Sequence, residues 1–149
     1  MADRDVTEEE LAELVRRTEE ATGAWLRGEM ARYLELTPHA QGFTLMNPLG
    51  GPPHRYEDRS DSIMAAASYF KGGEAALELA EAHAWGDTVV LVMIERQHGQ
   101  VGELPPQDWS LRVTHVYRRA GSDWELVHRH ADPLVDPIEL EQMGALARK

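Results

Sequence analysis

Two histidines and an aspartate recur at every second residue near the end of the chain. They are His128, His130 and Asp132, within the stretch DWELVHRHADPLVDP that covers residues 123–137. Side chains on a strand point to alternate faces, so a strand would place all three on one side of a sheet. Imidazole titrates near pH ~6.5 and a carboxylate within reach can orient it, as general acid–base catalysis requires. The same pattern also fits a metal site or a solvated sheet face.

These three residues belong to a predicted β-hairpin. Residues 109–119 (WSLRVTHVYRR) and 124–134 (WELVHRHADPL) alternate like strands around the turn AGSD. A four-residue turn sets Arg119 opposite Trp124 and therefore His115 opposite His128. That register gathers three histidines and an aspartate on one apolar face, which is the usual make-up of a small-molecule site. A turn of three or five residues would shift the pairing by one and separate His115 from His128.

Composition excludes several classes of function. The chain has 149 residues, the size of one domain, and we expect a single domain over residues 1–149. Its net charge is −11, which opposes binding to nucleic acid or to an anionic membrane. It contains no cysteine, which excludes disulfides, thiolate nucleophiles and cysteine-rich metal sites. No stretch has the apolar length of a signal peptide or a membrane span, so a cytoplasmic location is expected.

Helices are expected in the first third of the chain. Thr7 followed by Glu10 has the spacing of a capping box, and apolar residues then recur every three to four positions up to Trp25. A shorter helix is expected over residues 29–37, before Pro38, and it carries Tyr33. These apolar stripes are most simply explained by core packing.

The middle of the chain mixes signals. Residues 43–46 favour a short strand, and residues 61–73 favour a helix of about ten residues that ends at Gly72. Between them lies a polar stretch whose potential metal ligands are His54, Glu57, Asp58 and Asp61. Nothing fixes those side chains on one face, so a solvated loop is the simpler interpretation.

The second half is expected to be mainly strand. Residues 74–85 have a helix-favouring composition but also alternate, and composition alone leaves them undecided. Residues 88–97 (TVVLVMIERQ) are β-branched and apolar on both faces, as in a buried strand. Asp136 and Pro137 are suited to cap and begin a short final helix.

In this order and spacing, FTLMNPLGG, Gly86-Asp87 before an apolar strand, LRVTHVYRR and WELVHRHADPL resemble one known family. They are similar to the SnoaL-like proteins of the nuclear transport factor 2 and ketosteroid isomerase superfamily. The resemblance covers nearly the whole chain. It implies an α+β, NTF2-like (cystatin-like) cone, in which N-terminal helices pack on a strongly curved antiparallel sheet around an internal pocket. It also implies that residues 74–85 form a strand.

The resemblance carries over only part of a catalytic site. Polyketide cyclases of the superfamily have a histidine in a stretch like RVTHVYR, which corresponds to His115, and an acidic base on the last strand, for which Asp132 is the nearest candidate. The tyrosine and two carboxylates of ketosteroid isomerases have no matching positions, which argues against steroid isomerisation. With His130, these give three candidate catalytic residues. Candidate ligand contacts are His128, Tyr33, Trp25 and Arg112, although Arg112 is most simply a solvated strand residue and Trp25 a core residue.

Two classes of function remain open. The first is a cofactor-independent acid–base enzyme of isomerase, cyclase or dehydratase type, acting on a small, largely apolar carbonyl compound. The second is a binding or accessory protein with the same pocket and no turnover. An assembly module would be favoured if side chains filled the cone. No bound metal is expected, because the resemblance implies cofactor-free chemistry, although His128, His130 and Asp132 could reach one ion.

A homodimer is the expected assembly. In the predicted register the other face of the hairpin carries Arg112, Arg118 and Arg129 with valines between them. Proteins that resemble this chain commonly pair through that sheet face, and a two-fold axis would bury the mixed surface against its own copy.

Overall fold

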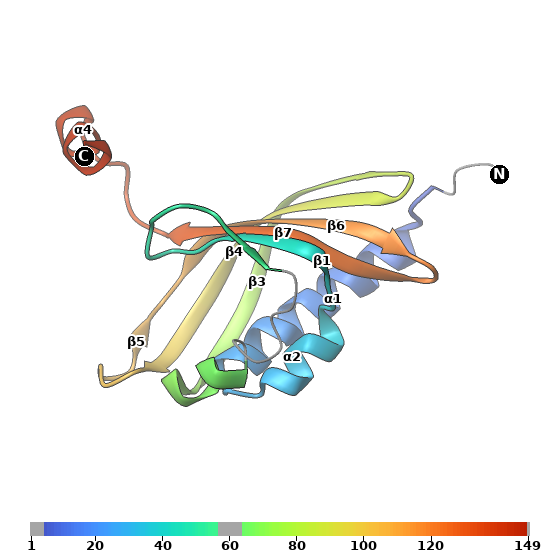
Figure 1. Cartoon of the computed structure of the whole chain (residues 1–149), viewed down its shortest axis with the longest axis horizontal. Coiled ribbons are helices and arrows are strands. Elements are labelled where there is room, and N and C mark those ends of the chain that lie inside the picture. Colours follow the sequence, from blue (N-terminus) through green and yellow to red (C-terminus); the bar gives the residue numbers. More distant parts are fainter. Residues whose placement is uncertain (1–4, 57–63, 149) are drawn as a thin grey trace.

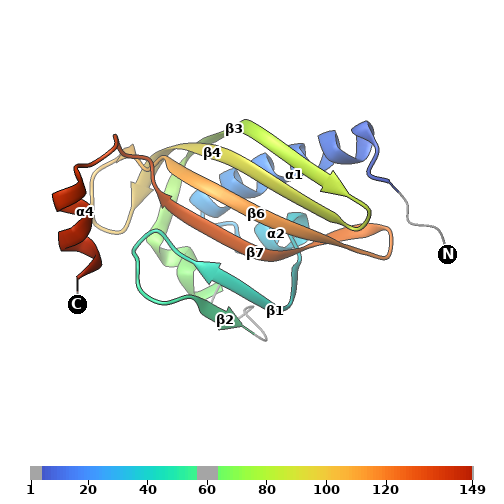
Figure 2. The ribbon, with the colours of Figure 1, turned by 90° about the horizontal axis from the view of Figure 1, so that it is seen from above.

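The computed structural model describes residues 5–56 and 64–148. Two helices open the chain, α1 (Glu8–Leu26) and α2 (Met30–Leu36), and both lie on one face of a curved sheet (Figures 1 and 2). The strands are β1 (His39–Met46), β2 (His54–Tyr56), β3 (Phe70–Trp85), β4 (Thr88–Val101), β5 (Gln107–Asp108), β6 (Leu111–Ala120) and β7 (Asp123–Pro133). The 3-10 helix η1 (Ala67–Tyr69) precedes β3, and helix α4 (Leu140–Ala147) follows β7.

The strands form one sheet in the order β2-β1-β7-β6-β4-β3, with β5 paired to the end of β4. Neighbouring strands run antiparallel except β1, which is parallel to β7. We call the sheet face toward α1 and α2 the inner face and the opposite face the outer face (Figure 1). The predicted α+β architecture, with N-terminal helices on a curved sheet, is confirmed.

The capping box of α1 forms as predicted. The Thr7 hydroxyl accepts a hydrogen bond from the Glu10 amide at 3.0 Å, and the Glu10 carboxylate accepts one from the Thr7 amide at 3.2 Å. Such a cap stabilises a helix by about 1 kcal/mol. The apolar stripe of α1, which includes Leu14, Ala21 and Ala24, is buried against the sheet.

Strand β3 confirms the strand implied for residues 74–85, against its local composition. It pairs with β4 along nearly its whole length, so the partner strand outweighs the helix propensity of its alanines and glutamates. Near its start, Gly73 passes so close to β4 that a Cβ atom would meet the His98 carbonyl, and a Cβ on Gly99 would meet the Gly72 carbonyl. Only glycines allow the two backbones this close approach.

The turn between β6 and β7 has the predicted geometry. Arg119 lies opposite Trp124, and Tyr117 lies opposite Leu126. Tyr117, Trp124 and Leu126 are all buried on the inner face. The alternation expected from the sequence therefore holds for the half of the hairpin next to the turn.

A β-bulge then changes the register. His128 pairs with Val116, so Val127 is an extra residue in β7 with no partner in β6. Beyond this bulge, His115 lies opposite Arg129 and not opposite His128. The predicted pairing of His115 with His128 is wrong for this reason, because one extra residue moves every later side chain of β7 to the other face.

Three other expectations are changed. Strand β2 lies inside the stretch predicted to be a polar loop, whose Glu57, Asp58 and Asp61 fall outside the described residues. Residues 64–66 are helical and η1 follows, but β3 begins at Phe70, so the predicted helix does not extend to Gly72. The last helix begins at Leu140, later than a cap at Asp136 would place it.

The core lies between α1 and the inner face. Its buried apolar residues come from α1, β1, β4, β6 and β7 and are Leu14, Phe43, Val89, Leu91, Met93, Val113, Tyr117, Trp124, Leu126 and Ala131. In the described part of the chain, none of the helices combines the length and the apolar character needed to cross a membrane.

Candidate functional site

An ion pair between Arg129 and Glu95 lies on the inner face. Arg129 comes from β7 just beyond the bulge, and Glu95 comes from β4. The guanidinium donates to both carboxylate oxygens, from Nη1 to Oε2 at 2.7 Å and from Nη2 to Oε1 at 2.9 Å. Glu95 is only 1% exposed, whereas the Arg129 side chain keeps 19% of its surface exposed. A bidentate pair of this kind is among the strongest side-chain interactions.

Two further donors complete the shell of Glu95. Gln97 Nε2 donates to Oε1 at 2.8 Å, and the Thr22 hydroxyl shares its proton between the Thr18 carbonyl at 3.1 Å and Oε2 at 3.3 Å. Four hydrogen bonds from two strands and α1 therefore surround a buried carboxylate. A buried charge is tolerated only when it is paired and hydrogen-bonded in this way.

His115 joins this ion pair to the core. Arg129 Nη1 lies 2.9 Å from His115 Nε2, and a guanidinium can only donate, so Nε2 accepts and the ring proton sits on Nδ1. Nδ1 then donates to the Tyr117 hydroxyl at 3.2 Å. Tyr117 donates to the Thr18 hydroxyl at 2.7 Å, because the Thr18 proton goes to the Leu14 carbonyl at 2.8 Å. The hydrogen bonds thus run in one direction, from Arg129 to the backbone of α1.

Burial sets the protonation of these groups. Burial, and then the positive charge of Arg129, hold the pKa of His115 well below its usual value of 6.5, so the imidazole is neutral. Burial raises the pKa of Tyr117 and keeps its hydroxyl protonated. Burial opposes the charge on Arg129, but the nearby Glu95 carboxylate more than offsets this, and the pKa of Arg129 is raised.

Aromatic side chains form a second group, between the two helices and strands β1 and β3. Trp25 of α1 contacts Tyr33 of α2 and Phe70 of β3, with ring centroids 4.9 Å and 5.1 Å apart. The Tyr33 hydroxyl is 2.9 Å from His39 Nε2, and the His39 ring stacks on Phe43. Both groups lie on the inner side of the sheet, the ion pair on β4 and β7 and the aromatic group on the two helices, β1 and β3.

The other predicted site residues lie on the outer face. His128 Nδ1 is 2.7 Å from the Thr44 hydroxyl of β1, and its pKa is lowered by partial burial and then by the charge of His130. His130 Nε2 is 3.3 Å from an Asp132 oxygen, with both side chains about two-fifths exposed. Arg112, 71% exposed, lies 3.9 Å from the same carboxylate.

The structure therefore divides the predicted site between two faces. His115, Tyr33 and Trp25 lie on the inner side, whereas the outer face carries His128, His130, Asp132 and Arg112. The expectation that His128, His130 and Asp132 share a face with His115 is wrong, because of the bulge, whereas Arg112 lies on the opposite face from His115, as predicted. The catalytic and binding roles of these residues stay predictions, as does an internal pocket.

Two residues of the inner cluster were missed from the sequence. Glu95 follows Val89, Leu91 and Met93 at the inward positions of a buried strand, and a charge there calls for a buried partner. That signal could have identified it. Arg129 could not have been placed inward without knowledge of the bulge at Val127.

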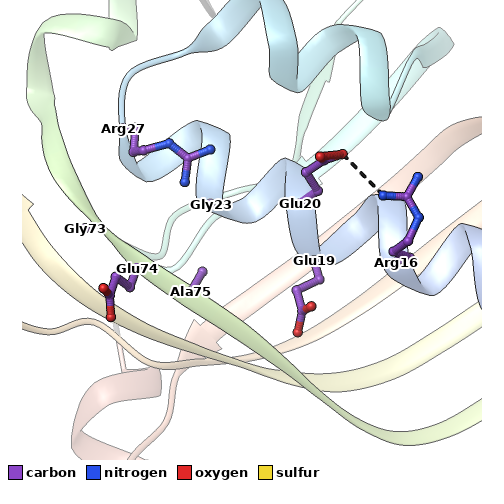
Figure 3. Close-up of a pocket in the computed structure, with 8 residues that line it drawn as sticks. All are labelled: Arg16, Glu19, Glu20, Gly23, Arg27, Gly73, Glu74 and Ala75. Atoms are coloured by element: carbon purple, nitrogen blue, oxygen red, sulfur yellow. Dashed lines mark ion pairs between the residues drawn. The ribbon is translucent and has the colours of Figure 1, made fainter.

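A separate hollow lies on the surface between α1 and β3. It has a volume of about 540 Å³ and is lined by Arg16, Glu19, Glu20, Gly23, Arg27, Gly73, Glu74 and Ala75 (Figure 3). Glu19 accepts a hydrogen bond from the Leu77 amide at 2.8 Å, and Arg16 lies 3.6 Å from Glu20. Glu19 is thus engaged with the edge of β3, and Arg16 and Glu20 with each other. Within residues 5–56 and 64–148, histidines and carboxylates form no group of three able to hold a metal ion.

Comparison with known proteins gives one family match. A family model described as "SnoaL-like domain" matches residues 18–136. The comparison with curated proteins found no match.

Solved structures of several proteins share the fold. A ketosteroid isomerase-like protein from Erwinia carotovora atroseptica superposes with a TM-score of 0.66 and 15% identity, covering 87% of this chain and 100% of that one. The CaMKII hub of S. rosetta superposes with a TM-score of 0.66 and 17% identity, covering 83% of this chain and 95% of that one. A protein from Streptomyces avermitilis, provisionally named a dehydratase of the NTF2-like family, superposes with a TM-score of 0.67 and 18% identity. The match covers 86% of this chain and 97% of that one. At such identities the likeness concerns the fold alone.

Proposed function

The chain belongs to the SnoaL-like domain family, and from that premise we propose that it binds a small, largely apolar molecule through a carbonyl or carboxylate oxygen. The ligand oxygen would bind the guanidinium of Arg129 on the inner face. Its apolar body would lie against Trp25, Tyr33 and Phe70. Proteins of this fold include some named for isomerases and dehydratases and others named as hubs, so the fold leaves both catalysis and binding open.

The observation that carries the proposal is the partial exposure of Arg129. Its bonds to Glu95 and His115 use three of the five guanidinium donors, and its side chain remains 19% exposed. The planar group is held by a carboxylate that two further groups, Gln97 and Thr22, also contact. A cation pre-positioned in this way can donate hydrogen bonds to a ligand oxygen without reorganising.

Protonation favours binding over turnover at this site. His115 is neutral and both of its ring nitrogens are hydrogen-bonded, so it has no free position for proton exchange. Tyr117 holds its proton in the same directed chain. A proton-transfer group needs a pKa near the working pH and an open path to the substrate.

Acid–base catalysis is the second candidate, and the pairing of His130 with Asp132 favours it. The two side chains are 3.3 Å apart and both reach solvent, so they could exchange protons with a carbonyl compound without any cofactor. Such a reaction would take place on the outer face. His130→Gln and Asp132→Asn would then lower turnover by about a hundredfold or more.

Thermal-shift screening of aromatic and aliphatic carbonyl compounds and carboxylates tests the binding proposal. Arg129 cannot be removed alone without leaving Glu95 unpaired, so we use the double variant Glu95→Gln with Arg129→Gln. We expect it to fold and to lose the ligand-induced stabilisation seen in the wild type. Arg112→Gln, which removes an exposed outer-face arginine, is the matched control and should bind normally. Equal binding by the double variant would contradict the proposal.

We also propose that the chain forms a homodimer through the outer face. Outward positions of β4 and β6 carry Val90, Val92, Ile94 and Val116, with Arg112 and Arg118 nearby. A two-fold axis would pair this mixed surface with itself. Light scattering at micromolar concentration should give twice the chain mass of 16.8 kDa. A mass of one chain would contradict it.

A further inference from the structure

Helix α4 exposes a stripe of large apolar side chains. It stands apart from the rest of the fold, beyond the end of β7 (Figures 1 and 2). Exposed fractions in α4 are 83% for Leu140, 54% for Met143 and 78% for Leu146, and in the segment before it 68% for Val135 and 44% for Ile138. Spacings of three residues put the first three on one side of the helix.

A helix of this length is not stable alone in water. It has eight residues, and isolated helices shorter than about 12–15 residues are marginal, because nucleation is costly and tertiary packing supplies most helix stability. One reciprocal cap is present, in which Gln142 accepts a hydrogen bond from the Glu139 amide at 2.8 Å. That bond satisfies one donor but buries no apolar surface. The stripe therefore calls for a surface that covers it.

The same chain carries an exposed apolar surface at the opposite end of the sheet. Trp85, beside the β3–β4 turn, is 59% exposed, and Val92, farther along β4 and opposite Thr114, is 36% exposed; both point from the outer face. In Figure 1, α4 and the β3–β4 hairpin rise at opposite ends of the sheet, on the side away from α1 and α2. Pro133 and Pro137 restrict the segment that joins β7 to α4 and disfavour its folding back.

A second copy of the chain fits this arrangement. A two-fold axis that lies in the outer face and runs perpendicular to the line joining its two ends exchanges those ends, and so brings α4 of each copy to the β3–β4 hairpin of the other. Charges agree with this pairing. Asp136, Glu139 and Glu141 make the start of α4 and the segment before it acidic. Arg118, at the facing end of β6, is half exposed and lies 3.7 Å from its partner Glu125.

We propose that α4 is an exchanged arm, with Leu140, Met143 and Leu146 of each protomer docking beside Trp85 and Val92 of its partner. This inference rests on the proposed pairing through the outer face. It adds that α4, whose apolar stripe is exposed in the single chain, gives the dimer much of its affinity. Two equivalent arms would be buried by one symmetric contact.

Cysteine cross-linking tests the contact directly, because the natural chain has no cysteine. Chains with Ala147→Cys and, separately, with His83→Cys keep the docking side chains intact. When one of the two carries a size tag and they are mixed and oxidised, we expect a disulfide-linked heterodimer. The control pairs Ala147→Cys with Leu49→Cys, which is 96% exposed on the β1–β2 connection. If Ala147→Cys cross-links to Leu49→Cys as efficiently as to His83→Cys, the proposed exchange of α4 is overturned.

A second measurement keeps the test independent of any introduced cysteine. Leu140→Ser, Met143→Ser and Leu146→Ser together should raise the dimer dissociation constant at least tenfold in sedimentation, with the monomer still folded. Leu49→Ser with Leu104→Ser, also exposed, is the matched control and should not change it. If the triple variant dimerises like the wild type, the proposed exchange of α4 is wrong and the outer-face dimer stands. If the wild type is itself monomeric, the exchange of α4 and the outer-face dimer are both wrong.

Discussion

At the scale of single residues, the inner face is organised around one buried carboxylate. Glu95 accepts hydrogen bonds from Arg129, Gln97 and Thr22, and Arg129 in turn bonds to His115. Removing one member of a buried ion pair leaves the other charge without compensation, which is costlier than removing both. The cluster should therefore behave as a unit.

Glu95→Gln tests that coupling. The change leaves the largely enclosed guanidinium of Arg129, 19% exposed, beside a neutral amide, and we expect the free energy of unfolding in urea to fall by up to about 3 kcal/mol. Combining it with Arg129→Gln should restore part of this loss, since two amides can bond to each other. If the losses in unfolding free energy of Glu95→Gln and Arg129→Gln instead add up in the double variant, the two sites do not interact.

The pH dependence of stability should report His115. Burial and Arg129 hold its folded pKa well below 6.5, so in the window beneath pH 6.5 the unfolded chain binds a proton that the folded chain does not. The proton that only the unfolded chain binds favours unfolding. The folded state therefore has its full stability above about pH 6.5 and loses stability as the pH falls from there toward the folded pKa of His115. His128, whose pKa is lowered by burial and then by His130, contributes with the same sign.

We expect the unfolding free energy of the wild type to fall below pH 6.5 with a limiting slope of about 1.4 kcal/mol per pH unit for each such histidine. His115→Gln should remove the larger part of that slope, and His128→Gln the smaller part. Chemical denaturation between about pH 4.5 and about pH 7.5 measures both. An unchanged slope in His115→Gln would mean that His115 is not the buried neutral group inferred here.

At the scale of elements, the bulge in β7 decides which side chains reach the inner face. Val127 is the extra residue, and Arg129 lies inward because of it. Deleting Val127 would remove the bulge and leave Leu126, His128 and Arg129 opposite the same partners in β6, so Arg129 would stay inward beside Glu95. We therefore expect the deletion variant to keep cooperative unfolding, with a melting temperature lowered by less than about 10 °C. Loss of cooperative unfolding would show that the bulge itself, and not only the register of Arg129, holds the sheet together.

Local sequence signals determine most elements and half of the hairpin. The Thr7 capping box, the β-branched apolar run of β4 and the four-residue turn before Trp124 each rest on short-range chemistry, and each was predictable. Strand β3 was not, because its alanines favour helix and only pairing with β4 makes it a strand.

The candidate site was predictable only in part, for a related reason. Tyr33, Trp25 and His115 were identified as candidates, and the structure places them together on the inner side. Arg129 was assigned to the outer face, because a bulge depends on the shape of the whole sheet and leaves no mark in the alternation of residues.

At the scale of the whole molecule, net charge opposes self-association. Each chain carries −11, so two copies repel one another unless salt screens them. Raising the salt concentration from about 50 mM to about 500 mM shortens the Debye length several-fold, and we expect the dimer dissociation constant to fall. Sedimentation at the two concentrations measures it. Weaker association at high salt would instead mean that contacts between opposite charges, such as arm to Arg118, dominate the interface.

The central claim is that Arg129 anchors a ligand oxygen on the inner face. The most direct test is a crystal structure of the protein soaked with the carbonyl compound or carboxylate that stabilises it most in the thermal-shift screen. We expect density for the ligand with an oxygen about 2.7–3.2 Å from the Arg129 guanidinium and its apolar body against Trp25 and Tyr33. Density beside His130 and Asp132 on the outer face, or in the hollow between α1 and β3, with the guanidinium of Arg129 left uncontacted, would contradict the claim.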